Sequence, residues 1–344
     1  MKVELFNKKN KKDLVSQLRS ESFDRITISF YKYINIDNIE ILRDYLYFKW
    51  TKLKVLGRVY IANEGINAQL SLPKHNLDPF LKQLKQNEDF NDLKIKKALI
   101  EGESFYKLNI KIKNEIVAYK IPKNEYDMNI VGKHFDYKDF NDAIDDGATV
   151  IDIRNYYEGE VGRFQNAIVP DIDRSEDLLP EIKKLLKGKE SKQILMYCTG
   201  GIRCEKASSY LIKNGFKNVN QLDGGIIKYA NDIKKNKVKS KFLGKNFVFD
   251  NRLGENITND IISNCHQCNK LSNSHKNCNN SSCHILFIQC DNCEIKYRGS
   301  CSEKCMNFNK LDEQDQKKFL KNKEVIFNGT NSDRLRPKIN NIFK

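Results

Sequence analysis

The sequence predicts an α/β protein of several domains, and three observations support this. Residues 24–130 show strand and helix patterns in the order βαββαβ. Residues 131–240 contain the apolar run 194–197 before an amphipathic helix pattern, the strand-then-helix order of an α/β domain. Eight of the ten cysteines lie in four close pairs within residues 241–310. Polar tails are expected on either side, at 1–23 and, with a basic character, at 311–344.

The first domain is justified element by element. An apolar run predicts a strand at 26–31, and Asp37 with Glu40 three residues later predicts a capped helix that continues to Trp50. Asp78-Pro79 is expected to start a second helix, with the proline at its first position. Further strands are expected at 59–62, 66–71 and 106–113. This order indicates a ferredoxin-like domain, a scaffold that often binds RNA on its sheet.

Two groups of lysines are candidate RNA contacts. Strict alternation places Lys107, Lys111 and Lys113 on one face of the last strand. A stretch of six lysines without an acidic residue begins at 234, and it contributes Lys234, Lys235 and Lys237. The net charge of +15 favours a polyanionic partner. A solvated edge, a solvated linker and a lysine-rich proteome are the alternatives, and they remain open.

The second domain is organised around a cysteine loop. The apolar run 194–197 predicts a buried strand, and a helix pattern starts near Glu205 with Gly215 as its C-terminal cap. Between them Cys198 opens a run of small residues that ends at Arg203. Backbone N–H groups of such a loop can converge on an anion and lower the pKa of the thiol. The alternative is that Cys198 is only a small buried hydrophobic residue.

The motif Cys198-x-x-Gly201-x-Arg203 resembles the active-site loop of the rhodanese superfamily. Upstream, Asp152-x-Arg154 followed by Glu158 resembles the first strand of that domain and its signature, and residues 222–226 resemble its closing turn. The resemblance implies that residues 131–240 form a parallel sheet with helices on both faces. It also implies that Asp152 and Arg154 stabilise the loop from beneath. Cysteine phosphatases have five residues between cysteine and arginine, whereas this chain has four, which argues against phosphatase chemistry. The remaining residues of the loop are its expected supporting residues: Thr199, Gly200, Gly201, Ile202 and Cys204.

The longer string 198–207, with a small α/β domain before it and a cysteine cluster after it, resembles the rhodanese-containing tRNA uridine hydroxylases. This resemblance implies conversion of the wobble uridine, position 34 in the tRNA anticodon loop, to 5-hydroxyuridine. It also implies O2 as co-substrate and a reductant whose identity is unknown. The sequence shows no dinucleotide fingerprint for flavin and no evident two-histidine-one-carboxylate iron site. Cys198 is therefore the one evident reactive group.

Two roles are open for this cysteine. In the first, the Cys198 thiolate adds to C6 of uracil, while Arg203 and the loop amides hold the developing negative charge or a flanking phosphate. In the second, Cys198 carries a persulfide, as in sulfurtransferases, and Cys204 either resolves it or only packs in the helix. A binding module with a vestigial loop is a third hypothesis. The intact cysteine, glycines and arginine argue against it.

The four cysteine pairs predict two structural zinc ions, each held by four thiolates. Pairing of the first with the third pair, and of the second with the fourth, is the preferred arrangement. His266, His275 and His284 are close enough in sequence to replace a thiolate, and disulfides are the alternative to metal. The pairs are Cys265 with Cys268, Cys278 with Cys283, Cys290 with Cys293, and Cys301 with Cys305.

The cellular location follows from what the sequence contains. The residues after Met1 do not form the apolar core of a signal peptide, and no apolar run approaches 18 residues. We therefore expect a cytoplasmic protein without a membrane segment. No obligate protein partner is evident.

Overall fold

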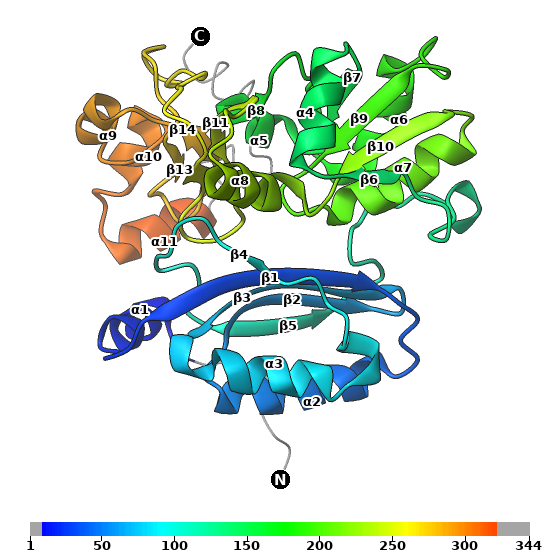
Figure 1. Cartoon of the computed structure of the whole chain (residues 1–344). Helices are drawn as coiled ribbons and strands as arrows, with labels where there is room; N and C mark the ends of the chain where they lie inside the picture. Colours follow the sequence, from blue (N-terminus) through cyan, green and yellow to red (C-terminus); the bar gives the residue numbers. More distant parts are fainter. Residues whose placement is uncertain (1–8, 322–344) are drawn as a thin grey trace.

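The computed structural model describes residues 9–321, which form two stacked α/β units with a cysteine-rich region beside the upper one (Figure 1). The lower unit is a five-stranded sheet with two helices beneath it, and its other face is turned toward the upper unit. The upper unit is built on a four-stranded parallel sheet. None of the helices in the described part of the chain is both long enough and apolar enough to cross a membrane.

The lower unit has the expected ferredoxin-like arrangement, with one strand added. The strand order is β4-β1-β3-β2-β5. The first four strands are antiparallel to their neighbours, and β5 runs parallel to β2. The clear alternation at 106–113 is therefore an additional edge strand, and the closing strand is the two-residue β4. The elements of the lower unit are β1 (Arg25–Tyr33), α2 (Ile39–Lys52), β2 (Leu56–Ala62), β3 (Gly65–Pro73), α3 (Leu77–Lys85), β4 (Lys96–Lys97) and β5 (Leu108–Ile112).

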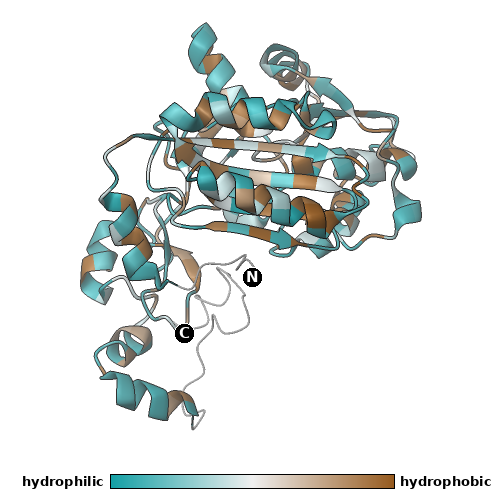
Figure 2. Ribbon diagram, turned by 90° about the horizontal axis from the view of Figure 1, so that it is seen from below, coloured by the Kyte–Doolittle hydropathy of each residue, from teal (hydrophilic) through white to brown (hydrophobic). Residues whose placement is uncertain are grey.

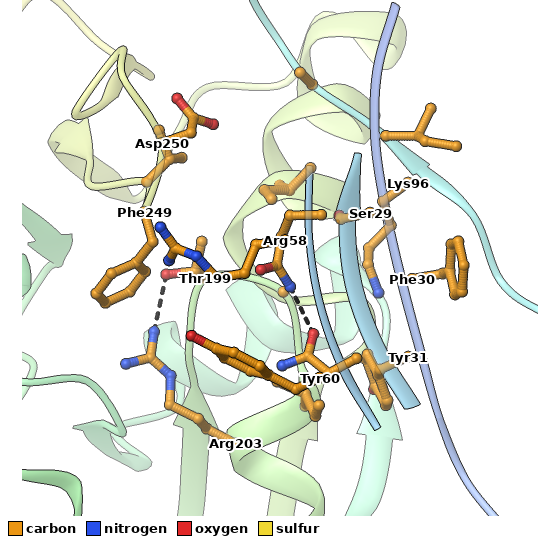
Figure 3. A pocket seen from close by; sticks show the side chains of 18 of the residues that line it. Ser29, Phe30, Tyr31, Arg58, Tyr60, Lys96, Thr199, Arg203, Phe249 and Asp250 are labelled. Atoms are coloured by element: carbon orange, nitrogen blue, oxygen red, sulfur yellow. Dashed lines mark hydrogen bonds between the residues drawn. The ribbon is translucent and has the colours of Figure 1, made fainter. Parts of the chain in front are cut away.

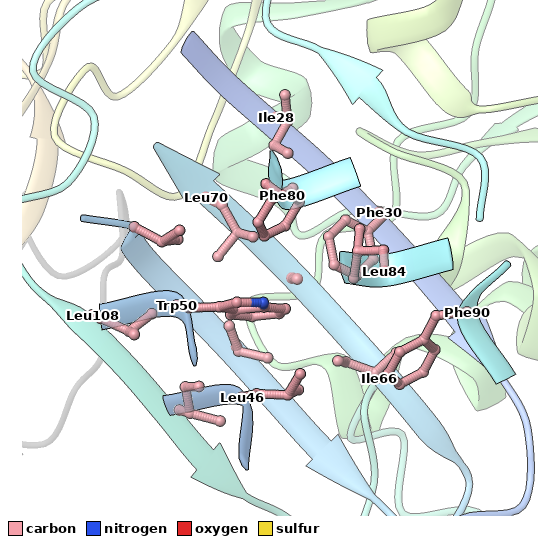
Figure 4. Packing of buried hydrophobic residues seen from close by; sticks show 14 of the residues in the cluster. Ile28, Phe30, Leu46, Trp50, Ile66, Leu70, Phe80, Leu84, Phe90 and Leu108 are labelled. Carbon is pink, nitrogen blue, oxygen red and sulfur yellow. The ribbon is translucent and has the colours of Figure 1, made fainter. Parts of the chain in front are cut away.

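The core of this unit lies between the sheet and α2 and α3. Trp50, Phe80 and Phe30 are fully or almost fully buried there and pack ring against ring (Figure 4). Figure 2 shows hydrophilic and hydrophobic residues alternating along the helices seen from below, as expected for helices with one face on a core. Because strand side chains alternate between faces, the neighbours of the core residues point to the opposite face of the sheet.

Of three local expectations for this unit, two are wrong, and the third, a polar tail, proves to contain a helix. Helix α2 begins after Asn38 without a side-chain cap, and the Asp37 carboxylate accepts a hydrogen bond from the Asn35 amide instead (2.8 Å). Helix α3 begins at Leu77, so Pro79 is its third residue. The polar tail expected at 1–23 contains helix α1 (Lys11–Arg19), which Asn10 caps by accepting from the Asp13 amide.

The upper unit is the expected parallel sheet, in the order β6-β10-β9-β7, with α4 and α8 on one face and α6 and α7 on the other. Strand β7 contains Asp152 and follows β6, so it is the second strand of the domain and not the first. Strand β8 pairs outside this sheet, with β11. The elements are β6 (Lys133–Phe135), α4 (Tyr137–Asp145), β7 (Thr149–Asp152), α5 (Tyr156–Val161), β8 (Gly162–Phe164), α6 (Ser175–Leu185), β9 (Gln193–Tyr197), α7 (Ile202–Lys213), β10 (Asn218–Leu222) and α8 (Gly225–Asn236).

The alternation along β9 decides which side of the sheet receives Cys198. Leu195 and Tyr197 belong to the core under α4 and α8. Ile194, Met196 and Cys198 belong to the core under α6 and α7. The cysteine therefore leaves the strand on the side of the helix that follows it, and its sulfur lies at the start of that helix.

The last part of the described chain begins with β11 and β12 and continues into the cysteine-rich region, whose elements are short. Its helix α11 lies in the segment 311–344 that was expected as a basic tail, and the rest of that segment, from 322, lies outside the described residues. The elements are β11 (Phe242–Asn246), β12 (Glu255–Asn256), β13 (His275–Asn277), β14 (Leu286–Ile288), α9 (Asp291–Tyr297), α10 (Glu303–Phe308) and α11 (Glu313–Lys321).

Candidate active site

The cysteine loop is the four-residue connection between β9 and α7. Helix α7 begins at Ile202, three residues before the expected start, and Gly201 precedes it with a φ of +95°, which favours glycine. The Gly201 N–H donates to the Cys198 sulfur at 3.1 Å. The amides of a helix start therefore converge on an anion as expected, and in this structure the anion is the sulfur itself. Gly215 ends the helix, with its N–H on the Ile212 carbonyl, as expected.

The environment of Cys198 favours the thiolate. Burial alone would raise the pKa of this fully buried group. The hydrogen bond from the Cys204 thiol, the charge of Arg203, and the backbone N–H groups of Arg203 and Cys204 outweigh burial and lower the pKa to about 5. Cys198 is therefore ionised at neutral pH, whereas burial and the neighbouring thiolate raise the pKa of Cys204 far above its ordinary value.

Arg203 is held by Glu158. The guanidinium donates to both carboxylate oxygens, at 2.6 and 2.8 Å, and also to the Thr199 hydroxyl at 3.0 Å. The Glu158 carboxylate is fully buried at the start of α5. Arg203 therefore braces the loop and acts on the sulfur through its charge, while three of its hydrogen bonds are made to Glu158 and Thr199.

Asp152 and Arg154 form a second, fully buried ion pair with two hydrogen bonds, at 2.8 and 2.6 Å. The Tyr197 hydroxyl donates to the same aspartate at 2.8 Å, and Arg154 donates to the Gly162 carbonyl at 2.7 Å. Among residues 9–321, the side-chain hydrogen bonds of this pair go to Tyr197 and Gly162 and not to the loop itself. It fixes the end of β9, directly before Cys198.

The turn at 223–225 closes the loop from the other side. The Ile226 N–H donates to the Cys198 carbonyl at 3.0 Å, and the Ile227 N–H donates to the Thr199 carbonyl at 3.1 Å. Gly225 has a φ of +67°, and a Cβ at this position would lie 2.5 Å from the Cys198 oxygen. Only glycine permits so close an approach of the two backbones.

The lower unit is fastened to helix α7 by polar contacts. The Tyr31 hydroxyl donates to Glu205 at 2.8 Å, and the Tyr33 hydroxyl donates to the Ile202 carbonyl at 3.3 Å. The ammonium of Lys206, a fully buried residue, lies 2.8 Å from Glu64 and 2.9 Å from Glu115. The polar turn at 63–65 thus reaches the helix that carries Arg203.

A cavity of about 330 Å³ lies between the open face of the lower sheet and the cysteine loop (Figure 3). Thr199, Gly200, Ile202 and Arg203 line it from above, whereas Cys198 is not exposed to it. Residues of the lower sheet and of the segment after β11 also line it: Ser29, Tyr31, Arg58, Tyr60, Asn67, Gln69, Lys96 and Phe249. Figure 3 shows Arg58, Tyr60 and Lys96 on the cavity side of the sheet, while Phe30 points away from it.

Lys96 is the cavity residue that sequence reasoning missed most clearly. It is buried in the two-residue strand β4, and its ammonium lies 4.5 Å from the centre of the Tyr31 ring. Burial lowers its pKa to about 8, although the Cys198 thiolate, Asp223 and Glu205 act in the opposite direction. Its ammonium makes no hydrogen bond or ion pair within residues 9–321. Two residues of β4 are too few to show a periodicity.

The eight paired cysteines form two groups of four sulfurs. Cys265, Cys268, Cys290 and Cys293 make one group, and the second and fourth pairs make the other, as preferred from the sequence. All sulfurs of a group lie within 4.8 Å of one another, and two neighbouring sulfurs of the second group are 3.8 Å apart. A tetrahedral zinc ion with Zn–S bonds of about 2.3 Å separates its sulfurs by about 3.8 Å, so both groups fit such an ion. All ten cysteines are free, and neither group includes a histidine.

The candidate RNA-binding lysines are all exposed. Lys107 and Lys113 flank the outer strand β5, which contains Lys111, and by register all three share the face of the sheet that lines the cavity. Lys234 and Lys235 lie in the last turn of α8, the helix that begins at the closing turn, and Lys237 follows it. The first group therefore extends the cavity face outward. Its contact with RNA remains a prediction.

The fold and the loop define a rhodanese-type protein whose cysteine loop is covered by a second domain. Family models match at residues 25–116 (UPF0176 acylphosphatase like domain), 136–232 (Rhodanese-like domain) and 243–306 (Rhodanase C-terminal). A rhodanese-related protein from Thermoplasma volcanium is a solved structure with partial likeness. It is 28% identical over 29% of this chain and 92% of that one, with a TM-score of 0.25.

Relatives with a common name match almost the whole chain. A protein from Leptospira interrogans is 47% identical over 98% of this chain and 93% of its own length. A protein from Photorhabdus laumondii is 44% identical over 96% and 98%, and one from Pectobacterium carotovorum is 43% identical over 94% and 93%. Each bears the name tRNA uridine(34) hydroxylase. The chain belongs to the tRNA uridine(34) hydroxylase family, which confirms the resemblance seen in its sequence.

Proposed function

We propose that this protein hydroxylates the wobble uridine of tRNA to 5-hydroxyuridine, with O2 as the source of the oxygen atom and Cys198 as the essential thiol. The family supports the reaction and the tRNA substrate. The observation that supports the role of Cys198 is its ionisation in a loop that borders a cavity large enough for one nucleoside. A tRNA substrate implies that the enzyme works in the cytoplasm.

The chemistry starts with addition of the thiolate to C6 of the ring. The new S–C6 bond moves an electron pair to C5 and O4, and this enolate-like system reacts with O2 at C5. One oxygen atom stays on C5, and the other leaves as water with two electrons from a reductant and two protons. Loss of the C5 proton and of the thiolate restores the double bond. Because Cys198 is fully buried, its sulfur has to become exposed to the cavity when the base binds.

Each part of the loop has a task in this scheme. The charge of Arg203 and the amide of Gly201 stabilise the thiolate before addition and after release. Glu158 keeps the guanidinium in place, because an arginine without its carboxylate would be free to leave the loop. The enolate oxygen develops on the opposite side of the base, where Lys96 and Arg58 provide cations.

The two cysteine groups hold structural zinc in this proposal. Closed sites of four thiolates leave no position for substrate, so the metal stabilises the region and takes no part in the reaction. The region still bears on the site, because Phe249 lies between β11 and β12 and lines the cavity. The tRNA anticodon loop is proposed to enter over the exposed lysines of β5.

Mass spectrometry of nucleosides tests the proposal. An anticodon stem-loop with U34 is incubated with the protein under ¹⁸O₂, with a reductant such as dithiothreitol or NADPH supplied in separate reactions. The expected product is 5-hydroxyuridine with one ¹⁸O, absent with Cys198→Ala and absent under nitrogen. Product formation by Cys198→Ala would overturn the role of the thiol, and ¹⁶O in the product would overturn the role of O2.

A persulfide on Cys198 is the second candidate, because a ring of amides around a buried sulfur also suits a bound sulfane sulfur. Incubation with thiosulfate followed by intact-protein mass spectrometry measures it. A gain of one sulfur that depends on Cys198, together with no oxygen gain on U34, would move the assignment to sulfur transfer.

A further inference from the structure

One row of side chains runs straight across the lower sheet beneath the cysteine loop. Lys96 in β4 pairs with Ser29 in β1, Ser29 pairs with Gln69 in β3, and Gln69 pairs with Arg58 in β2. Directly paired residues point to the same face. All four line the cavity. The row therefore presents four polar side chains side by side to whatever the cavity holds.

The hydrogen-bonding capacity of this row alternates. The Gln69 amide nitrogen donates to Asn67 Oδ1 at 2.6 Å, so its Oε1 is left as an acceptor in the middle of the row. On one side stand the Ser29 hydroxyl and the Lys96 ammonium, and on the other stands the Arg58 guanidinium. None of these three groups has a hydrogen-bond partner or ion pair among residues 9–321. The order across the sheet is donor, acceptor, donor.

That order is complementary to one edge of uracil. The ring presents the O4 acceptor, the N3–H donor and the O2 acceptor in sequence, whereas cytosine presents a donor at N4 and an acceptor at N3. We propose, on the basis of the hydroxylase function above, that Gln69 accepts from N3–H of the target uridine while Ser29 or Lys96 and Arg58 donate to its two carbonyl oxygens. This row is then the element that selects uracil over cytosine.

The same placement orients the base for reaction. C6 lies opposite N3 in the pyrimidine ring, so a base whose N3 faces the sheet turns C6 toward the other wall of the cavity. That wall is the loop that begins with Cys198. Tyr60 and Phe249 provide aromatic surfaces at the cavity, which suits a base taken out of its stack. A base bound with N3 facing the row is therefore both selected as uracil and oriented with C6 toward the cysteine loop.

Binding and turnover of three stem-loops test the proposal: U34, C34 and 3-methyluridine at position 34, which lacks the N3–H. The wild-type protein is expected to bind U34 about tenfold to a hundredfold more tightly than the other two. With Gln69→Met, U34 binding should weaken by a similar factor, and methylation of N3 should have no further effect. Gln69→Glu retains an acceptor and should retain the preference for U34. Gln86→Met, an exposed glutamine at the end of α3, is the matched control.

The experiment distinguishes a failure of this inference from a failure of the proposed hydroxylase function. If Gln69→Met keeps the wild-type preference for U34 over 3-methyluridine, the row does not read N3 and the inference is overturned. If the wild-type protein binds the three stem-loops in the expected order and yet forms no 5-hydroxyuridine, the hydroxylase function fails and the recognition row stands. A circular dichroism spectrum of each variant shows that a loss of binding does not come from unfolding.

Discussion

The sulfur of Cys198 is fully buried and still ionised, because groups of its own loop compensate for the loss of water. The Cys204 thiol is the strongest of these groups. We predict that Cys204→Ala raises the pKa of Cys198 by about one unit, equal to one lost hydrogen bond of ~1.4 kcal/mol. Thiolate absorbance at 240 nm measured against pH shows the shift. An unchanged titration would mean that Cys204 only packs in the helix.

The buried ammonium of Lys96 lowers the free energy of unfolding and provides a cation in the cavity. Its pKa of about 8 lies below the ordinary 10.5, so between these pH values the unfolded chain binds more protons and the free energy of unfolding rises with pH. Below pH 8 the buried charge lowers stability by a constant amount. Lys96→Met should therefore raise the melting temperature at pH 7 by about 2–5 °C, with a smaller gain at pH 10.

The same substitution should reduce hydroxylation about tenfold or more, because the cavity loses a donor. Lys97→Met is the matched control, since Lys97 is exposed and points to the other face of the sheet. It should change neither quantity. A lower melting temperature for Lys96→Met at pH 7 would contradict the account of its burial.

At the scale of elements, the closing turn has no room for a single added methyl group at Gly225. Gly225→Ala would place Cβ 2.5 Å from the Cys198 carbonyl oxygen at a φ of +67°. We expect a loss of roughly 3 kcal/mol in unfolding free energy and a fall in hydroxylation of at least about a hundredfold, measured by urea denaturation and nucleoside analysis. Gly215→Ala is the control, with φ +92° and open space around it, and should lower stability by about 1 kcal/mol and leave activity intact.

The helices and strands show which parts of the structure can be predicted from the sequence. Apolar runs and glycines predict β9 and the end of α7, because these depend on local periodicity and local backbone geometry. The parallel sheet follows only from the resemblance of the cysteine motif. The start of α7 is missed, since its first turn is also the end of the cysteine motif, with Arg203 turned to Glu158 and Thr199. The cysteine loop follows from one contiguous motif. Lys96, Gln69 and Arg58 do not, because only the sheet order places them in one row under the loop.

At the scale of the whole molecule, the interleaved cysteine pairs connect the two candidate metal sites. The two pairs of each group lie on either side of a pair of the other group in the sequence, so loss of a bound ion from one group would loosen residues of the other. We predict two zinc ions per chain by elemental analysis. Release of zinc by a mercurial should occur in one cooperative step and unfold the region 265–305. Release in two independent steps would contradict this coupling.

The position of the lower sheet over the cysteine loop also bears on the survival of the protein in the presence of O2 and peroxides. A thiolate is the form of cysteine that is oxidised most readily, and its exposure sets the rate. Here the sulfur has no surface in contact with solvent. The upper unit's core buries the sulfur and the lower sheet covers its loop, so under the proposed mechanism the thiolate is exposed to an oxidant chiefly while a base is bound.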